Sequence, residues 1–164
     1  MEQTSYFICR YRLDDTDGYL IWYSNGSDGI LCDTDGSVAC FSSPAELFRY
    51  AELRGIEIEL EDPVLHNLDA VAAWMRRDDT AGPDCNQLLR AWNLFTDLSA
   101  SVHGDFDGDY GRTNIVYEKL FEYAGTPDTR VQWNGEELRV LRDTLGSGLD
   151  LFRRYVRENP VIGS

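Results

Sequence analysis

The amino-acid sequence predicts an α+β fold in a single domain that spans residues 1–164. A chain of this length fits one domain, since domains usually hold about 100 to 200 residues. Residues 1–62 contain short runs in which apolar and polar residues alternate, whereas apolar residues in 63–164 recur at intervals of three and four. We therefore expect an N-terminal antiparallel β-meander of about five strands with one inserted helix, packed on a C-terminal half of about four helices.

Four strands are predicted within the first 41 residues. Residues 5–11 alternate, and the polar stretch 14–18 is expected to turn the chain before the apolar run 19–23. Two further Asp-Gly pairs, a strong hairpin signal, precede the apolar runs 30–32 and 38–41. Short strands separated by such turns indicate a meander.

A helix and a fifth strand are predicted next. Ser43-Pro44-Ala45-Glu46 has the pattern of a capping box with proline at the first helical position, and Gly55 is expected to end the helix. Residues 56–61 then alternate apolar side chains with glutamates, which predicts a half-buried strand.

The remaining chain is predicted to be helical. Apolar spacing indicates helices over residues 65–75, 85–102, 113–122 and 134–156, and Asp84 is the expected N-cap of the second of these helices. The exposed face of the last helix is expected to be basic, with residues Arg139, Arg142, Arg153, Arg154 and Arg157.

The charge is strongly negative. The chain has 29 acidic and 15 basic residues, a net charge of −14, with 13 acids against 4 bases in residues 1–65 and 16 against 11 in residues 66–164. Such a surface repels nucleic acid and anionic membranes, so we expect no direct contact with either. It attracts basic proteins, although the same charge is also explained by solubility alone.

Familiar catalytic and cofactor motifs are missing from the sequence. Lys119 does not follow the glycine of a phosphate-binding loop, and the glycines of residues 146–148 lack the context of a dinucleotide fingerprint. An acidic stretch that starts at Asp105 has Tyr110 where a calcium loop needs glycine and Val116 where it needs glutamate. There is no C-x-x-C pair, and no hydrolase motif. We therefore expect no catalytic residue, no metal and no cofactor, with an enzyme as the least favoured alternative.

The expected location is the cytoplasm. Residues 1–5 lack the basic and apolar regions of a signal peptide, and no run reaches the roughly 18 apolar residues of a membrane span. The four cysteines are accordingly expected to be unpaired.

Candidate partner-binding residues are acidic or aromatic. Side chains of alternate residues share one face of a strand at intervals of roughly 7 Å, so the three glutamates of residues 56–61 form a row, which Asp62 extends. The other explanation is that these charges protect an edge strand from pairing with another chain. A loop rich in aspartate and a tryptophan in a loop add a second acidic site and an aromatic anchor. The candidates are Glu57, Glu59, Glu61, Asp62, Asp105, Asp107, Asp109 and Trp133.

The chain resembles, in type, the small acidic bacterial immunity proteins of polymorphic toxin systems. The features that carry this resemblance are the compact meander, the Ser43-Pro44-Ala45-Glu46-Leu47-Phe48 segment, the acidic strand and the acidic helical half. The resemblance implies a non-enzymatic protein that neutralises a toxin by covering its basic active site, and it assigns no family residue to any position. A structural or regulatory module that self-associates, with the basic helix face against the acidic sheet of another copy, is the alternative.

Overall fold

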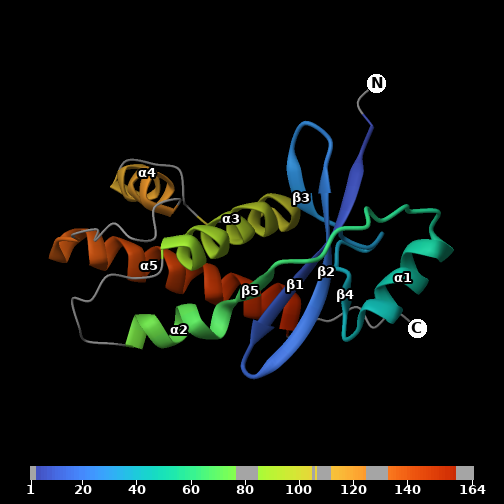
Figure 1. The fold of residues 1–164 in the computed structure, drawn as a ribbon, viewed down its shortest axis with the longest axis horizontal. Helices are drawn as coiled ribbons and strands as arrows, with labels where there is room; N and C mark the ends of the chain where they lie inside the picture. The colour runs from blue at the N-terminus through green and yellow to red at the C-terminus, as the bar shows by residue number, and fades with distance from the viewer. Residues whose placement is uncertain (1–2, 77–84, 105, 107–111, 125–132, 158–164) are drawn as a thin grey trace.

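The computed structural model describes residues 3–76, 85–104, 106, 112–124 and 133–157. Its fold is mixed α+β, as predicted from the sequence. The strands are β1 (Ser5–Leu13), β2 (Thr16–Ser24), β3 (Asp28–Ile30), β4 (Cys40–Phe41) and β5 (Leu65–Asn67). The helices are α1 (Pro44–Leu53), α2 (Leu68–Arg76), α3 (Cys85–Val102), α4 (Arg112–Ala124) and α5 (Gly135–Phe152), which continues as a π-helical turn, η1 (Arg153–Arg157). Figure 1 shows α2 to α5 gathered on one side of the sheet and α1 on the other.

A long hairpin of β1 and β2 forms the centre of the sheet. The strands pair antiparallel from Ser5–Ser24 to Leu13–Thr16, so the turn is only Asp14-Asp15, with φ angles of 53° and 60°. Both turn amides donate to the carboxylate of Asp69, at 2.6 and 2.8 Å. Both turn residues adopt the left-handed conformation, which aspartate tolerates better than most residues other than glycine, and the bonds to Asp69 satisfy their amides.

The predicted turn at residues 14–18 is thus too long, because Asp17 and Gly18 belong to β2. A Cβ atom at Gly18 would overlap the ring of Tyr11 on the neighbouring strand. The glycine is required here by close side-chain packing and not by a turn.

The sheet has the order β3-β2-β1-β5, and β4 also pairs with β2. The strand predicted over residues 56–61 is wrong: in this stretch only Ile58 bridges to Tyr6, and the fifth strand is Leu65–Asn67, parallel to β1. The alternation fails at Leu60, which is 90% exposed. Pro63, which has no N–H for a ladder, follows soon after and helps to end the pairing.

The helices follow their predicted positions, with one difference at the start of α2. Residues 65–67, predicted as helix, form β5, and Asn67 accepts a hydrogen bond from the Ala70 amide at 3.0 Å, as a residue before a helix does. The capping box of α5 joins Asn134 and Glu137. In α1, Ser43 caps as predicted, but the Glu46 carboxylate accepts from Ser42 and not from Ser43. The predicted cap Asp84 lies outside the described residues.

Apolar side chains pack on both faces of the sheet. One cluster joins the sheet to α2, α3, α4 and α5, and in it the ring of Tyr11 meets that of Phe152 at 4.9 Å. A second cluster, which includes Ile21, Leu47 and Ile58, lies between the sheet and α1. Among the described helices, none has the length and apolar character that crossing a membrane requires.

Candidate binding surface

The acidic segment, residues 57–62, connects the bridge at Ile58 to the start of β5. Its carboxylates belong to Glu57, Glu59, Glu61 and Asp62, all of which are exposed. The segment is attached to the sheet by the Glu59 amide, which donates to the Tyr6 carbonyl at 2.8 Å. Within the described residues, no ion pair involves any of the four carboxylates. Their negative charge is therefore turned to the solvent.

A break in register places part of this segment over a cleft. From the bridge Tyr6–Ile58 to the first ladder pair, Arg10–Leu65, β1 advances by four residues and the other chain by seven. Three extra residues make the segment arch away from the edge of β1. The space left is a cavity of about 440 Å³, here called the Trp22 cleft.

The Trp22 cleft has an aromatic and apolar interior and an acidic rim. Phe7 and Trp22, opposite each other on β1 and β2, form the aromatic part, with ring centroids 5.8 Å apart. Glu61 and Asp62 are on the rim, together with Asp28 of β3. Sequence reasoning missed Asp28 because its Asp-Gly pair was interpreted as a turn, whereas both residues lie in a strand.

Asp97 of α3 adds a further negative group near the cleft. Burial, together with the charge of Asp28, raises the pKa of the Asp97 carboxyl to about 6. The nearby indole N–H of Trp22 lowers the pKa of Asp97 in part. The Nε1 atom of this indole is buried, and it forms no hydrogen bond of standard geometry with a described residue. No sequence motif marks Asp97, because it is one polar position on a long amphipathic helix.

A cysteine and a histidine meet at the inner end of the cleft without forming a catalytic pair. Cys9 Sγ lies 3.9 Å from Nδ1 of His66, and the same nitrogen lies 3.2 Å from the Arg10 carbonyl oxygen. A carbonyl only accepts, so Nδ1 carries the proton and has no lone pair for the thiol. Burial and the charge of Asp97 raise the pKa of Cys9 to about 12, and burial lowers the pKa of His66. The thiol is therefore protonated and unreactive at neutral pH.

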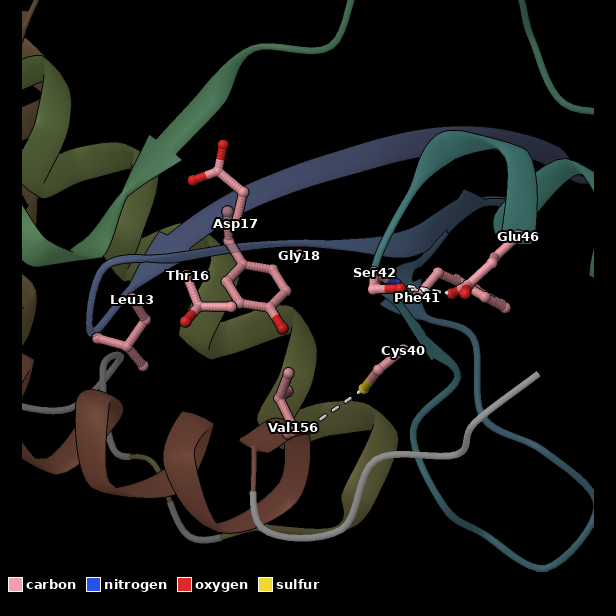
Figure 2. A pocket seen from close by; sticks show the side chains of 10 residues that line it. Leu13, Thr16, Asp17, Gly18, Cys40, Phe41, Ser42, Glu46 and Val156 are labelled. Atoms are coloured by element: carbon pink, nitrogen blue, oxygen red, sulfur yellow. Dashed lines mark hydrogen bonds between the residues drawn. The ribbon is translucent and has the colours of Figure 1, made fainter. Parts of the chain in front are cut away.

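A second cavity, of about 480 Å³, lies where β2, β4, α1 and η1 meet (Figure 2). Asp17 and Glu46 are among its lining residues, and the Asp17 carboxylate points away from Cys40 and Val156. Hydrogen bonds from Arg12 and Arg10 lower the pKa of Asp17 to about 2, and hydrogen bonds from Ser42 lower the pKa of Glu46. Both groups are thus ionised at neutral pH, whereas a general acid–base pair needs pKa values that differ.

The thiol of Cys40, also in Figure 2, is engaged in hydrogen bonds. It donates toward the carbonyl oxygens of Val38 and Val156, at 3.4 and 3.5 Å.

Of the other predicted binding residues, the structure describes only Trp133, which does not line the Trp22 cleft. Asp105, Asp107 and Asp109 lie outside the described residues. Trp133 is half-buried against the larger apolar cluster, with the Lys119 ammonium 4.7 Å from its ring centroid. Across the part of the chain that the structure describes, His, Cys, Asp and Glu side chains nowhere form a group of three able to hold a metal ion.

The basic face predicted for the last helix is partly engaged within the molecule. Arg142 lies over the ring of Trp74, 5.5 Å from its centroid, and Arg153 pairs with Asp14 at 3.2 Å. These two arginines are less available to a second copy of the chain than the sequence suggested.

Comparisons of this chain with protein-family models, with curated proteins and with solved structures gave no match. The function must therefore be argued from the residues of the chain itself.

Proposed function

We propose that this protein is a non-enzymatic acidic binding protein that captures a basic protein partner through the acidic segment and the Trp22 cleft. The observation that carries the proposal is that four neighbouring carboxylates are exposed without an ion pair to a described residue and adjoin an aromatic cleft. Grouped like charges repel one another, and this repulsion is relieved when a cationic surface covers them.

Exposed apolar side chains within the same surface favour a protein as the partner. Leu60 is 90% exposed and Val64 is 51% exposed, and both lie among the acids. A small cation or a basic peptide without apolar groups leaves these side chains in water. A protein surface buries them, and each buried apolar side chain adds affinity to the electrostatic attraction.

The particular role that we propose is that of a cytoplasmic immunity protein that neutralises a bacterial toxin. The charge of −14 fits a partner with a basic active site, such as a nuclease, because the acidic surface would occupy the place of its phosphate-bearing substrate. Cys9, Cys32, Cys40 and Cys85 form no disulfide with one another, which fits a reducing compartment.

The test uses the polypeptide encoded by the neighbouring reading frame, expressed with and without this protein. We expect growth arrest that the wild-type protein relieves, and rapid association that weakens as salt concentration rises. The variant Glu57→Lys/Glu59→Lys/Glu61→Lys should associate at least about tenfold more slowly and fail to protect.

The matched control is Glu52→Lys/Glu118→Lys/Glu122→Lys, which makes the same charge change at exposed positions on α1 and α4. It should protect almost as well as the wild type. Full protection by the first variant, or equal loss in both, would contradict the assignment of the acidic segment.

A further inference from the structure

The geometry points to the Trp22 cleft as a receptor for one arginine side chain of the protein partner, an inference that rests on the function proposed above. The alkyl stem would lie along Phe7 and Trp22, and the guanidinium group would reach the carboxylates of Asp28, Glu61 and Asp62. Each step of this assignment follows from the way the cleft is built.

The first step is the position of the cleft at an edge that the fold leaves uncovered. Between Tyr6 and Arg10, β1 pairs with β2 on one side, while on the other side the arching segment stands off from the strand. The cavity therefore opens beside a strand that pairs with β2 along its whole length, so the cavity is already present in the unbound protein. Such preformed sites bind with a smaller loss of conformational entropy.

The second step is the size and lining of the cavity. Its volume of about 440 Å³ is within the range of roughly 300 to 1,000 Å³ that is usual for ligand sites, so it accepts a long side chain. The interior is apolar and aromatic, and the charged groups stand on the rim. This matches a side chain with an apolar stem and a charged end.

The third step is the charge. Three of the lining side chains, Asp28, Glu61 and Asp62, are carboxylates, and no lysine or arginine of the described segments lines the cleft. His66 also lines the cleft, and burial lowers its pKa, so its imidazole is neutral at pH 7. Low-dielectric walls concentrate the field of the carboxylates within the cleft, which favours a cation.

The fourth step distinguishes arginine from lysine. A guanidinium group is planar and weakly hydrated, stacks on aromatic faces, and presents several N–H donors in fixed directions. The cleft offers two aromatic rings and carboxylates from two separate segments, β3 and the acidic segment. A lysine ammonium would keep more of its hydration and would use the rings less effectively.

The carboxyl of Asp97 lies close enough to the cleft to feel its charge. Its pKa is raised partly by the charge of Asp28, so the negative potential of Asp28 extends to α3. A guanidinium group in the cleft would compensate it and would draw the Asp97 carboxyl toward its ionised form.

The test is a nuclear magnetic resonance titration of the labelled protein with the peptide acetyl-Gly-Arg-Gly-amide at low salt. We expect saturable shifts of the Trp22 indole N–H and of the Phe7 and Ser24 amides, with a dissociation constant on the order of 1 mM. The citrulline peptide, which has nearly the same shape without the charge, should bind at least about tenfold more weakly, and the lysine peptide should bind more weakly than arginine.

Two variants localise the binding. Asp28→Asn/Asp62→Asn should weaken the arginine peptide about tenfold, whereas the control Glu118→Gln/Glu122→Gln, which removes the same charge from α4, should leave binding unchanged. All four residues are exposed, so neither variant disturbs the core. Equal binding of the arginine and citrulline peptides, or equal losses in the two variants, would overturn the proposal.

These outcomes are separate from those that test the proposed function. If the arginine peptide does not bind the cleft but reversal of Glu57, Glu59 and Glu61 abolishes protection, the cleft is not an arginine site, and capture of a basic partner through the acidic segment stands. If the peptide binds as expected but no basic partner requires the acidic segment, the proposed function fails and the cleft remains an arginine site.

Discussion

Asp97 keeps its proton to a higher pH than an ordinary aspartate, with a pKa of about 6, because burial and the charge of Asp28 both disfavour its carboxylate. In the unfolded chain this carboxyl titrates near 3.8 and in the folded chain near 6. As the pH rises, the unfolded chain therefore loses this proton first. The contribution of Asp97 to the free energy of unfolding therefore falls as the pH rises from about 4 to about 6. Above pH 6 this contribution is at its lowest.

We expect Asp97→Asn to remove this pH dependence. Relative to the wild type, the variant should therefore be more stable at pH 7.5 than it is at pH 4. Since solvent still reaches the carboxyl and screens it, the gain is on the order of 1 kcal/mol. Urea unfolding of both proteins across this pH range measures it. The difference between them isolates Asp97 from groups such as Asp17, whose lowered pKa acts in the opposite direction. An unchanged pH profile in the variant, with the exposed Asp143→Asn as control, would contradict the role of Asp97.

At the scale of elements, a glycine of α5 sets the contact between this helix and α3. A Cβ atom at Gly148 would overlap the ring of Phe95, which is fully buried. At Gly146, two residues earlier, a Cβ atom would meet only the terminal methyl of Met75, at 3.1 Å. The close approach of α5 to α3 therefore depends on glycine at position 148 and not on glycine at position 146.

Gly148→Ala should lower the free energy of unfolding by about 1 to 3 kcal/mol, because a well-packed aromatic ring must move. Gly146→Ala is the matched control: a flexible methionine yields, and alanine raises helix propensity by about 1 kcal/mol, so this variant should be neutral or more stable. Chemical denaturation of the two variants gives the comparison. Equal losses of stability would show that the contact with Phe95 is not what requires glycine.

The hairpin turn depends on an element far along the chain. Asp69, in the first turn of α2, accepts both amides of Asp14-Asp15. Asp69→Ala should therefore destabilise the protein by about 1 to 2 kcal/mol. The variant Asp14→Asn/Asp15→Gly provides a second background, because asparagine and glycine adopt positive φ more easily than aspartate. If the hydrogen bonds to Asp69 stabilise the turn, Asp69→Ala should cost the same free energy in this background. If Asp69 only offsets backbone strain, Asp69→Ala should cost less there. Thermal unfolding of the four proteins distinguishes these cases.

Local signals predicted the elements that local interactions determine. Ser43, Pro44 and Gly55 act within a few residues of α1, and its bounds were accordingly predicted well. The strand at Leu65–Asn67 was missed because its pairing with β1 is a contact between distant segments, and its three residues show no alternation. The Trp22 cleft arises because residues 58–65 are three residues longer than the stretch of β1, residues 6–10, that they accompany. This difference in length cannot be recognised before the strand register is known. Glu61 and Asp62 were therefore identified as binding residues from charge, whereas Asp28 and Asp97 were not.

For the whole molecule, the alternative to capture of a partner is self-association, in which the basic face of α5 meets the acidic sheet of a second copy. The net charge of −14 opposes this at neutral pH, and Arg142 and Arg153 are engaged within the chain. We therefore expect light scattering to give a monomer from about 10 to 500 mM salt, because screening weakens attraction and repulsion alike without a specific contact. Toward the isoelectric point near pH 4.4 the repulsion disappears, and solubility should reach its minimum. A dimer at neutral pH that dissociates as salt rises would favour the self-association alternative instead, and the acidic segment would then be one half of an interface between two copies of this chain.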